Sequence, residues 1–275
     1  MQTHIQCLQR SPNNMLKNQI VFVTGAARGI GRGVAQAVLE AGGKVVLADL
    51  DNTALDNTRD ELCSSLNVPG QSIFTTRLDV ADAASVQKAF EAAQGHYGQI
   101  NGLVNNAGIT RLGPNLESEV NDWQQQLNVN LIGTHLCCTR FAEILISAGT
   151  PGAIVNIASN AGKVGYPNMA GYNASKAAVI SLTRTLSTEW AEHNINVNGV
   201  CPGGVDTPML REVAMSVGAR IGEDPDDLLK TMVPAQMGRH IQPLEIGRVI
   251  AFLLSDAALI IRGQSINIDG GDTPY

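Results

Sequence analysis

Tyr172 and Lys176 are the pair of residues in this sequence best suited to acid–base chemistry. They are four positions apart in a segment with helical periodicity, so both side chains project from one face. A phenol has a pKa of about 10, and a neighbouring ammonium group lowers it by favouring the phenolate. Ser159, just past an apolar run upstream, could donate a hydrogen bond to the same substrate oxygen. The three residues predict proton transfer to an alcohol or ketone, although singly they also fit a solvated pair and a turn residue.

A glycine-rich turn near the start of the chain has the composition of a nucleotide-binding loop. It follows an apolar run at 20–23 and opens a helical segment. Its glycines permit a tight turn and let the backbone approach a pyrophosphate, while the N-terminus of the helix directs amide groups and positive dipole at the phosphates. The residues expected at the cofactor are Gly25, Arg28, Gly29, Ile30 and Gly31.

Asp49 stands at the end of the next apolar run and bears on the choice of cofactor. A carboxylate there accepts hydrogen bonds from the ribose hydroxyls of NAD and repels the 2′-phosphate of NADP. Its alternative role is to cap the following helix, a role that Asp51 or Asn52 could fill instead. Arg28 argues the other way, because a guanidinium in the glycine loop could reach a 2′-phosphate. The placement of Asp49 favours NAD, with NADP as the second choice.

Short β-branched runs alternate with helical stretches and supply the scaffold for these residues. The expected strands are 20–23, 45–48, 73–78, 103–104, 154–157, 197–200 and 266–268. The expected helices are 30–41, 53–66, 83–97, 123–147, 171–193 and 243–254. This alternation is typical of a parallel sheet covered by helices on both faces. We therefore predict an α/β fold, one doubly wound, Rossmann-like domain over residues 15–275 with a seven-stranded parallel sheet.

Two segments depart from this alternation. Residues 1–14 are polar, contain Pro12 and are expected to form a flexible extension. Residues 205–237 show no strand pattern, carry most of their charge in 223–230, and lie between the last two strands. Their position is that of a substrate loop or lid.

The overall composition excludes several kinds of partner. The 275 residues contain 19 Lys and Arg against 25 Asp and Glu, a net charge of −6, whereas nucleic acids and anionic lipids require clustered cations. No run of about 18 apolar residues predicts a membrane span, and the opening segment lacks the apolar core of a secretory signal. The five cysteines are odd in number and lack metal-ligand spacing. We expect reduced thiols, no metal site and a cytoplasmic location.

Further motifs occur in order along the chain. They are Leu78-Asp79-Val80, Asn105-Asn106-Ala107-Gly108, Asn128-Val129-Asn130-Leu131, Tyr172-Asn173-Ala174-Ser175-Lys176, Pro202-Gly203-Gly204-Val205-Asp206-Thr207 and Ile268-Asp269-Gly270-Gly271. With the glycine turn at 24–31 and with Ser159, they make nearly all of residues 17–271 resemble the classical short-chain dehydrogenase/reductase family. The family's usual activity is hydride transfer between a nicotinamide cofactor and a carbon that bears a hydroxyl group.

The resemblance implies roles for individual residues. Ser159, Tyr172 and Lys176 match the catalytic positions, and Asn130 matches a residue that holds a water linking Lys176 to solvent, with Asn128 a rival by spacing alone. The resemblance also implies cofactor contacts at the adenine, from Asp79 at the amino group and Val80 behind the ring. Asn106, Ala107 and Gly108 would contact the cofactor from the motif that ends the fourth strand. At the nicotinamide, Pro202 and Gly203 would lie beneath the ring and Thr207 at the carboxamide, with Val205 in the same 202–207 motif. Asn105 is expected to be half structural.

Three functions stay open at this stage. The first is an NAD-dependent enzyme that interconverts a small secondary alcohol and its ketone. The second is an NADPH-dependent 3-oxoacyl-carrier-protein reductase, favoured by Arg28, and the third is a catalytically silent dinucleotide sensor, disfavoured by the complete motif. The family resemblance also implies a homotetramer built on the long apolar helix and the helix of Tyr172.

The substrate is not identified by the sequence, which leaves sugars, polyols, hydroxy acids and steroids as candidates. The residues expected to line the pocket are Arg111, Asn160, Tyr166, Gly204 and Met209. Arg111 or Arg220 could bind a substrate carboxylate, but a surface arginine is the simpler interpretation of each.

Overall fold

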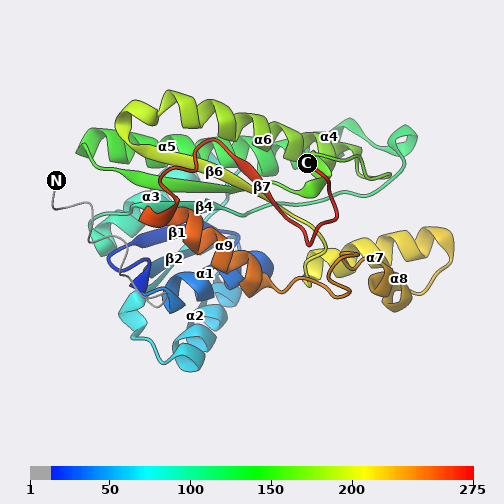
Figure 1. The fold of residues 1–275 in the computed structure, drawn as a ribbon, viewed down its shortest axis with the longest axis horizontal. Coiled ribbons are helices and arrows are strands. Elements are labelled where there is room, and N and C mark those ends of the chain that lie inside the picture. The colour runs from blue at the N-terminus through cyan, green and yellow to red at the C-terminus, as the bar shows by residue number, and fades with distance from the viewer. Residues whose placement is uncertain (1–13) are drawn as a thin grey trace.

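The structure is a computed structural model that describes residues 14–275. The expected extension at 1–14 therefore lies outside the described residues, apart from Asn14, which begins a short turn. The described chain has three layers, with a sheet between two layers of helices (Figure 1).

Seven strands form one parallel sheet, as predicted. They are β1 (Ile20–Thr24), β2 (Lys44–Asp49), β3 (Ile73–Arg77), β4 (Gly102–Asn105), β5 (Gly152–Ile157), β6 (Ile195–Pro202) and β7 (Ser265–Ile268). The strand order is β3-β2-β1-β4-β5-β6-β7, and every neighbouring pair is parallel. Because the order reverses between β1 and β4, the carboxyl ends of these strands mark the place where open α/β sheets bind ligands.

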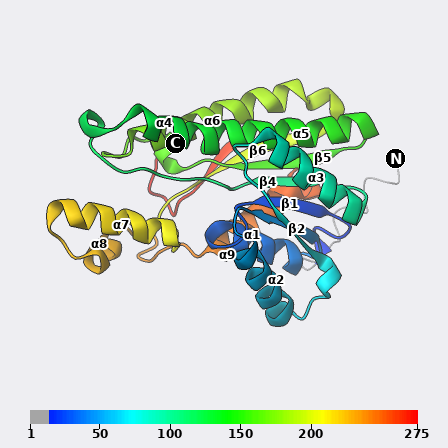
Figure 2. The ribbon, with the colours of Figure 1, turned by 180° about the vertical axis from the view of Figure 1, so that it is seen from behind.

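Helices cover both faces of the sheet. They are α1 (Gly29–Glu40), α2 (Asn52–Leu66), α3 (Ala83–Tyr97), α4 (Val120–Leu127), α5 (Gly133–Ala148), α6 (Ala170–Glu189), α7 (Pro208–Ile221), α8 (Pro225–Thr231) and α9 (Pro243–Leu254). Helices α1, α2 and α9 lie on one face, and α3, α5 and α6 lie on the other (Figures 1 and 2). Each layer has its own apolar core, which explains the continuously apolar strands.

The long apolar helix expected from the sequence is apolar enough to suggest a membrane span, contrary to the expectation that no segment would be. Helix α4, the π-helical turn η5 (Asn128–Ile132) and α5 form a continuous helix of 29 residues, Val120–Ala148. By length and composition this helix could cross a membrane. However, Cys137, Phe141 and Leu145 are fully buried in the core that α5 shares with α3 and the sheet. Core helices pass the same test, and packing against the core accounts for part of its apolar character.

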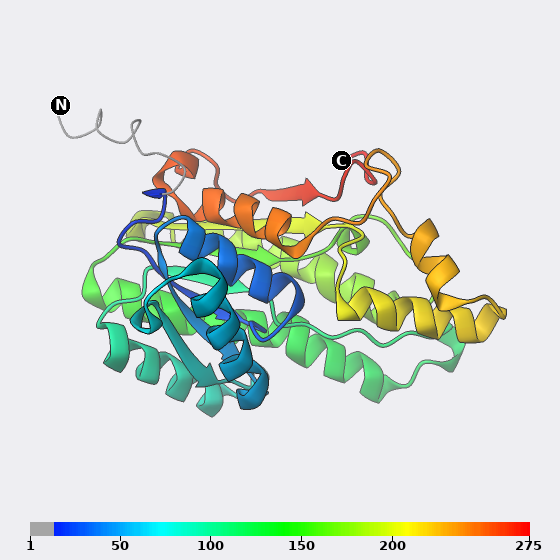
Figure 3. The same cartoon turned by 90° about the horizontal axis from the view of Figure 1, so that it is seen from below.

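Helices α7 and α8 project beyond the carboxyl edge of the sheet (Figures 1 and 3). They occupy most of the segment 205–237, in which the sequence analysis identified no helix. Thr207 and Asp224 cap these helices through their side chains, and Pro208 and Pro225 follow the caps. Proline is tolerated in the first turn because its missing N–H would have no partner there. The two cap-proline pairs are the signals that could have predicted both helices.

Candidate active site

Ser159, Tyr172 and Lys176 come together at the carboxyl edge of the sheet. Ser159 follows β5, and the other two lie one turn apart near the start of α6. Lys176 Nζ lies 5.7 Å from the centre of the Tyr172 ring and donates a hydrogen bond of 2.8 Å to the carbonyl of Ile157. Ser159 and Lys176 are buried, whereas Tyr172 keeps partial exposure. The arrangement gives a phenol that a substrate can reach, backed by an amine and a hydroxyl.

The expectation that Lys176 lowers the pKa of Tyr172 is wrong for the protein alone. Desolvation raises the pKa of the phenol, and hydrogen bonding with Ser159 offsets only part of this effect. Burial also lowers the pKa of Lys176 to about 8, because a desolvated ammonium is disfavoured. Sequence spacing shows which groups are neighbours, but the cost of desolvation depends on the surrounding fold.

Ser159 fills the structural role considered for it, and its catalytic role stays a prediction. Its Oγ accepts a hydrogen bond of 3.1 Å from the backbone N–H of Ala161 and caps the short 3₁₀ turn η6 (Asn160–Gly162). A hydroxyl can accept and donate at the same time. The capping bond leaves the Ser159 proton free to donate. It donates to Asn160 Oδ1 at 3.4 Å, a long bond that a bond to a substrate oxygen would have to replace.

Asn130 lies beside Lys176, whereas Asn128 is exposed. The Asn130 side chain is fully buried, and its amide exchanges two hydrogen bonds with the backbone of Ile109, at 2.8 and 2.9 Å. A Cβ on Gly108 would lie 3.3 Å from Asn130 Oδ1 and 3.5 Å from Lys176 Nζ. The geometry favours Asn130 over Asn128, and its role in holding a water stays a prediction.

The glycine loop is shaped by its backbone and fixed by one side chain. Gly25 and Gly29 have φ angles of 63° and 56°, which L side chains rarely adopt. A Cβ on Gly31 would overlap the carbonyl oxygen of Gly25. Asn106 Nδ2 donates to the carbonyls of Thr24 and Gly25, at 2.9 and 2.8 Å. A loop free of side chains at these positions suits the close approach of a pyrophosphate.

Asp49 ends β2 beside the glycine loop. Its Oδ2 accepts a hydrogen bond of 3.1 Å from the N–H of Ala27. Asp51 caps α2 by accepting from the N–H of Ala54, so the capping role does not belong to Asp49. A carboxylate has about four acceptor sites, which leaves sites for ribose hydroxyls. Arg28 is exposed and makes no side-chain hydrogen bond or ion pair within residues 14–275.

The remaining predicted cofactor residues share this edge of the sheet. At or just after the carboxyl ends of β3, β4 and β6 lie Asp79, Val80, Ala107, Gly108, Pro202, Gly203 and Val205. Thr207 follows them in the chain and approaches the glycine loop, since a Cβ on Gly29 would lie 3.4 Å from the methyl carbon of Thr207. The loop, the carboxylate of Asp49 and the hydroxyl of Thr207 together fit a nicotinamide dinucleotide.

Known proteins resemble this chain along nearly its whole length. A family model described as enoyl-(acyl carrier protein) reductase matches residues 25–273. D-threitol dehydrogenase of Mycolicibacterium smegmatis is 37% identical over 259 residues, 94% of each chain. The 3-oxoacyl-(acyl-carrier-protein) reductase of Synechocystis is 35% identical, over 93% of this chain and 97% of that one. A solved structure of actinorhodin polyketide ketoreductase with NADPH has a TM-score of 0.88 at 30% identity, covering 94% and 98% of the two chains.

The chain belongs to the classical short-chain dehydrogenase/reductase family. Membership makes it an oxidoreductase that acts on CH–OH groups with a nicotinamide dinucleotide. Within residues 14–275, no group of three or more His, Cys, Asp or Glu side chains is placed to hold a metal ion.

A buried polar network lies beneath this short-chain dehydrogenase site, between the sheet and the helices α5 and α6. Of its members, only Asn105 was predicted from the sequence to have a structural role. Asn105 Nδ2 donates to Asn156 Oδ1 at 2.8 Å and to Cys138 Sγ at 3.1 Å. Asn156 Nδ2 donates to Thr183 Oγ1 at 3.0 Å. The network joins β4, β5, α5 and α6, which gives Asn105 its structural role. One polar residue inside the apolar run 154–157 is the signal that could have found Asn156.

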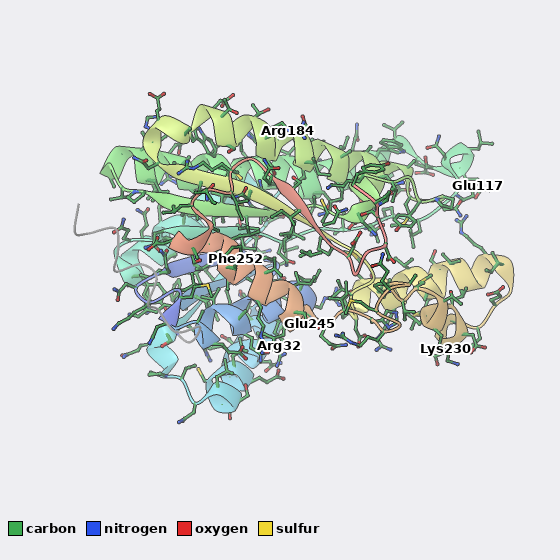
Figure 4. The ribbon with its side chains drawn as sticks, viewed as in Figure 1. Arg32, Glu117, Arg184, Lys230, Glu245 and Phe252 are labelled. Carbon is green, nitrogen blue, oxygen red and sulfur yellow. The ribbon has the colours of Figure 1, made fainter. Side chains whose placement is uncertain are left out.

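Arg111 and Arg220 line one pocket of about 220 Å³, between the 111–118 segment, α4, the start of α6 and the end of α7. Glu117, labelled in Figure 4, and Asp122 line the same pocket. Glu117 lies 4.0 Å from Arg220, and both arginines are exposed. Because acidic groups compensate their charge, the pocket gives no particular support to binding of a substrate carboxylate.

Proposed function

We propose that this chain is an NAD-dependent enzyme that interconverts a small secondary alcohol and its ketone. The observation that carries the proposal is the meeting of Ser159, Tyr172 and Lys176 at the same sheet edge as the glycine loop. A silent dinucleotide sensor has no need of a reachable phenol between a hydroxyl and an amine. The geometry therefore favours catalysis over sensing.

The chain's own residues hold the substrate and move its proton. A bound nicotinamide would supply the hydride chemistry, accepting hydride from the carbinol carbon in oxidation or donating it in reduction. Tyr172 Oη removes the hydroxyl proton in oxidation and donates it in reduction. Ser159 donates a hydrogen bond that holds the substrate oxygen beside the phenol. Lys176 provides positive charge and a donor for the ribose, and Asn130 connects it to solvent through a water.

The protonation states of the free protein suit the reductive direction. The raised pKa keeps Tyr172 protonated near neutrality, which is the state that donates to a ketone oxygen. Lys176, with a pKa of about 8, is still mostly charged at pH 7. Oxidation requires the phenolate, so it benefits from any further positive charge brought to the site, as an oxidised nicotinamide would.

We propose NAD as the cofactor, with NADP less favoured. Asp49 keeps acceptor sites beside the loop, and its negative charge opposes a 2′-phosphate. The second candidate, an NADPH-dependent 3-oxoacyl-carrier-protein reductase, draws support from the exposed Arg28 and from the likeness to the Synechocystis reductase and the polyketide ketoreductase. Replacement of Asp49 tests this choice directly.

A substrate panel with both cofactors tests the proposed function. Sugars, polyols, hydroxy acids and steroid alcohols are assayed by nicotinamide absorbance with NAD and with NADP. We expect kcat/KM with NAD to exceed that with NADP, and Asp49→Ser to reduce this ratio about tenfold, equivalent to about 1.4 kcal/mol. Turnover confined to NADPH and 3-oxoacyl thioesters supports the second candidate, and no turnover with either cofactor supports the sensor.

We also propose a cytoplasmic homotetramer in which residues 205–237 act as the lid. The free thiols of Cys63, Cys137, Cys138 and Cys201 support a reducing compartment. The exposed Ile132 and Ile146 on the long helix support association. The projection of α7 and α8 beyond the sheet edge that carries Tyr172 supports the lid (Figure 3).

A further inference from the structure

A buried amide connects the Ser159 hydroxyl to a second hydroxyl group. Ser159 Oγ donates to Asn160 Oδ1 at 3.4 Å, and Asn160 Nδ2 donates to Tyr166 Oη at 3.0 Å. The Asn160 side chain is only 5% exposed, so both ends of its planar amide are engaged inside the protein. Tyr166 Oη is therefore two hydrogen bonds and one amide group away from the Ser159 oxygen.

Tyr166 is held in place, yet its own proton is free. Asn173 Nδ2 on α6 donates to the backbone carbonyl of Tyr166 at 2.9 Å, which fixes the segment at its main chain. Asn160 fixes the end of the ring. Tyr166 Oη accepts from Asn160, and within residues 14–275 its O–H donates to no protein group. With 39% of its surface exposed, Tyr166 presents a fixed donor to solvent or to a ligand.

The charge around Tyr166 disfavours an anionic ligand and keeps the donor protonated. Burial, followed by the charges of Asp272 and Asp269, raises the pKa of Tyr166, and the hydrogen bond from Asn160 offsets part of this. The phenol therefore remains a donor at neutral pH. A carboxylate or phosphate on the substrate would meet two like charges here, whereas a neutral hydroxyl would not.

We propose that Tyr166, positioned by Asn160, binds a second hydroxyl group of the substrate, so that the substrate is a neutral polyol or the corresponding hydroxy ketone. Ser159 and Tyr172 hold the reacting oxygen, and Tyr166 donates to another oxygen on the same carbon chain. Asn160 is a positioning residue, because its Nδ2 donates to Tyr166 Oη and so orients that hydroxyl. This inference rests on the proposed function and narrows its substrate class.

The test compares alcohols that differ in their number of hydroxyl groups. The ratio of kcat/KM for a four-carbon tetritol to kcat/KM for butan-2-ol is measured with NAD and with NADP. Tyr166→Phe removes only the phenolic oxygen and should lower this ratio about five- to tenfold, the worth of one hydrogen bond of about 1 kcal/mol or slightly more. Tyr97→Phe is the matched control, since Tyr97 donates to the carbonyl of Gln71 at 3.1 Å, outside the site.

A second variant keeps the test valid if the phenylalanine variant folds poorly. Asn160→Asp retains the size of the side chain, but a carboxylate can only accept and would capture the Tyr166 proton. It should lower the same ratio, while Tyr97→Phe leaves the ratio unchanged. Two results would overturn this inference but not the proposed function. One is an unaltered ratio in either site variant when that variant is well folded. The other is turnover of the panel alcohols with no preference for those that have a second hydroxyl. Absence of turnover on the whole panel overturns the proposed function.

Discussion

At the scale of single residues, Lys176 and Tyr172 show how burial sets the protonation state of the two groups proposed to act in catalysis. The two side chains are close, with 5.7 Å from the amine to the ring centre, yet desolvation raises one pKa and lowers the other. Both shifts favour the neutral forms of these groups. Burial thus keeps the Tyr172 phenol protonated unless further positive charge, such as that of an oxidised nicotinamide, is brought to the site.

Replacing Tyr172 by Phe should abolish turnover while leaving dinucleotide binding nearly intact. The phenylalanine ring keeps the packing of the phenol but cannot exchange a proton. We expect kcat to fall by about 10²-fold or more, as is typical on removal of a general acid/base. Rate assays and a nucleotide titration followed by fluorescence measure the two effects, and retained activity would remove Tyr172 from the mechanism.

The buried ammonium of Lys176 predicts a pH-dependent stability difference. Its pKa falls from 10.5 to about 8 on folding, so the unfolded chain binds more protons between these values and native stability rises with pH there. The full cost, about 3 kcal/mol at 1.36 kcal/mol per pKa unit, is present below pH 8. Lys176→Met removes it, so the melting temperature of the variant relative to the unmodified protein should be highest near pH 7.

That advantage should narrow as the pH rises from 8 towards 10.5. The variant also loses the hydrogen bond to the carbonyl of Ile157, but this loss does not create a pH dependence of the same form. Paired thermal melts at several pH values measure the difference. A gap that stays constant with pH would show that Lys176 is not desolvated as the structure indicates.

At the scale of elements, the turn between β1 and α1 is the place where glycine is most clearly required. Gly31 lies in the first turn of α1, where its φ is unexceptional, and it is needed because the carbonyl of Gly25 and the amide of Asn106 occupy the space of a Cβ. By contrast, nothing lies within 4 Å of a Cβ on Gly95 in α3. Replacing Gly31 therefore tests the lack of space for a side chain, whereas replacing Gly95 tests helix propensity alone.

Gly31→Ala and Gly95→Ala should change stability in opposite directions. The first forces the loop apart and should destabilise the protein by about 1–3 kcal/mol, with weaker dinucleotide binding. The second adds a methyl group in open space and should stabilise α3 by about 0.5–1 kcal/mol. Denaturant unfolding measures both, and a neutral Gly31→Ala would contradict the close packing of the loop on Asn106.

At the scale of the whole molecule, the long helix Val120–Ala148 leaves apolar side chains outside the core. Ile132 is 44% and Ile146 is 39% exposed, and fourteen residues, about four helical turns, place them on the same face about 21 Å apart along the helix. Their burial against a second copy would explain both the hydropathy of the helix and the proposed homotetramer.

Charges on this face should weaken assembly. We expect light scattering of the unmodified protein to give about four times the chain mass of 29.1 kDa, and Ile132→Glu with Ile146→Glu to give smaller species. Leu116→Glu is the control, because Leu116 is fully exposed on a turn away from α5. A mass of one chain for the unmodified protein would contradict any oligomer.

Much of the fold could be predicted because buried segments need apolar residues, and these form recognisable runs in the sequence. The seven strands were expected within a few residues, since a sheet covered on both faces needs apolar runs. Helices α7 and α8 were missed because they project from the body and show little apolar periodicity, although their caps were visible. The choices between Asn128 and Asn130, and between Asp49 and Asp51 as the cap, needed the structure to show which side chain is buried or bonded.

The sequence by itself determined the family and the sheet and predicted the reacting groups, because these depend on residue type, order and spacing. Only the tertiary structure decided that the pKa of Tyr172 is raised, although the neighbouring Lys176 would be expected to lower it. The reason is that desolvation depends on all the groups packed around the phenol. Only the tertiary structure joined Asn160 to Tyr166 and to Ser159, because a hydrogen bond depends on where side chains end in space. The proposal that the substrate is a polyol therefore rests on the folded arrangement of residues that the sequence showed only as neighbours.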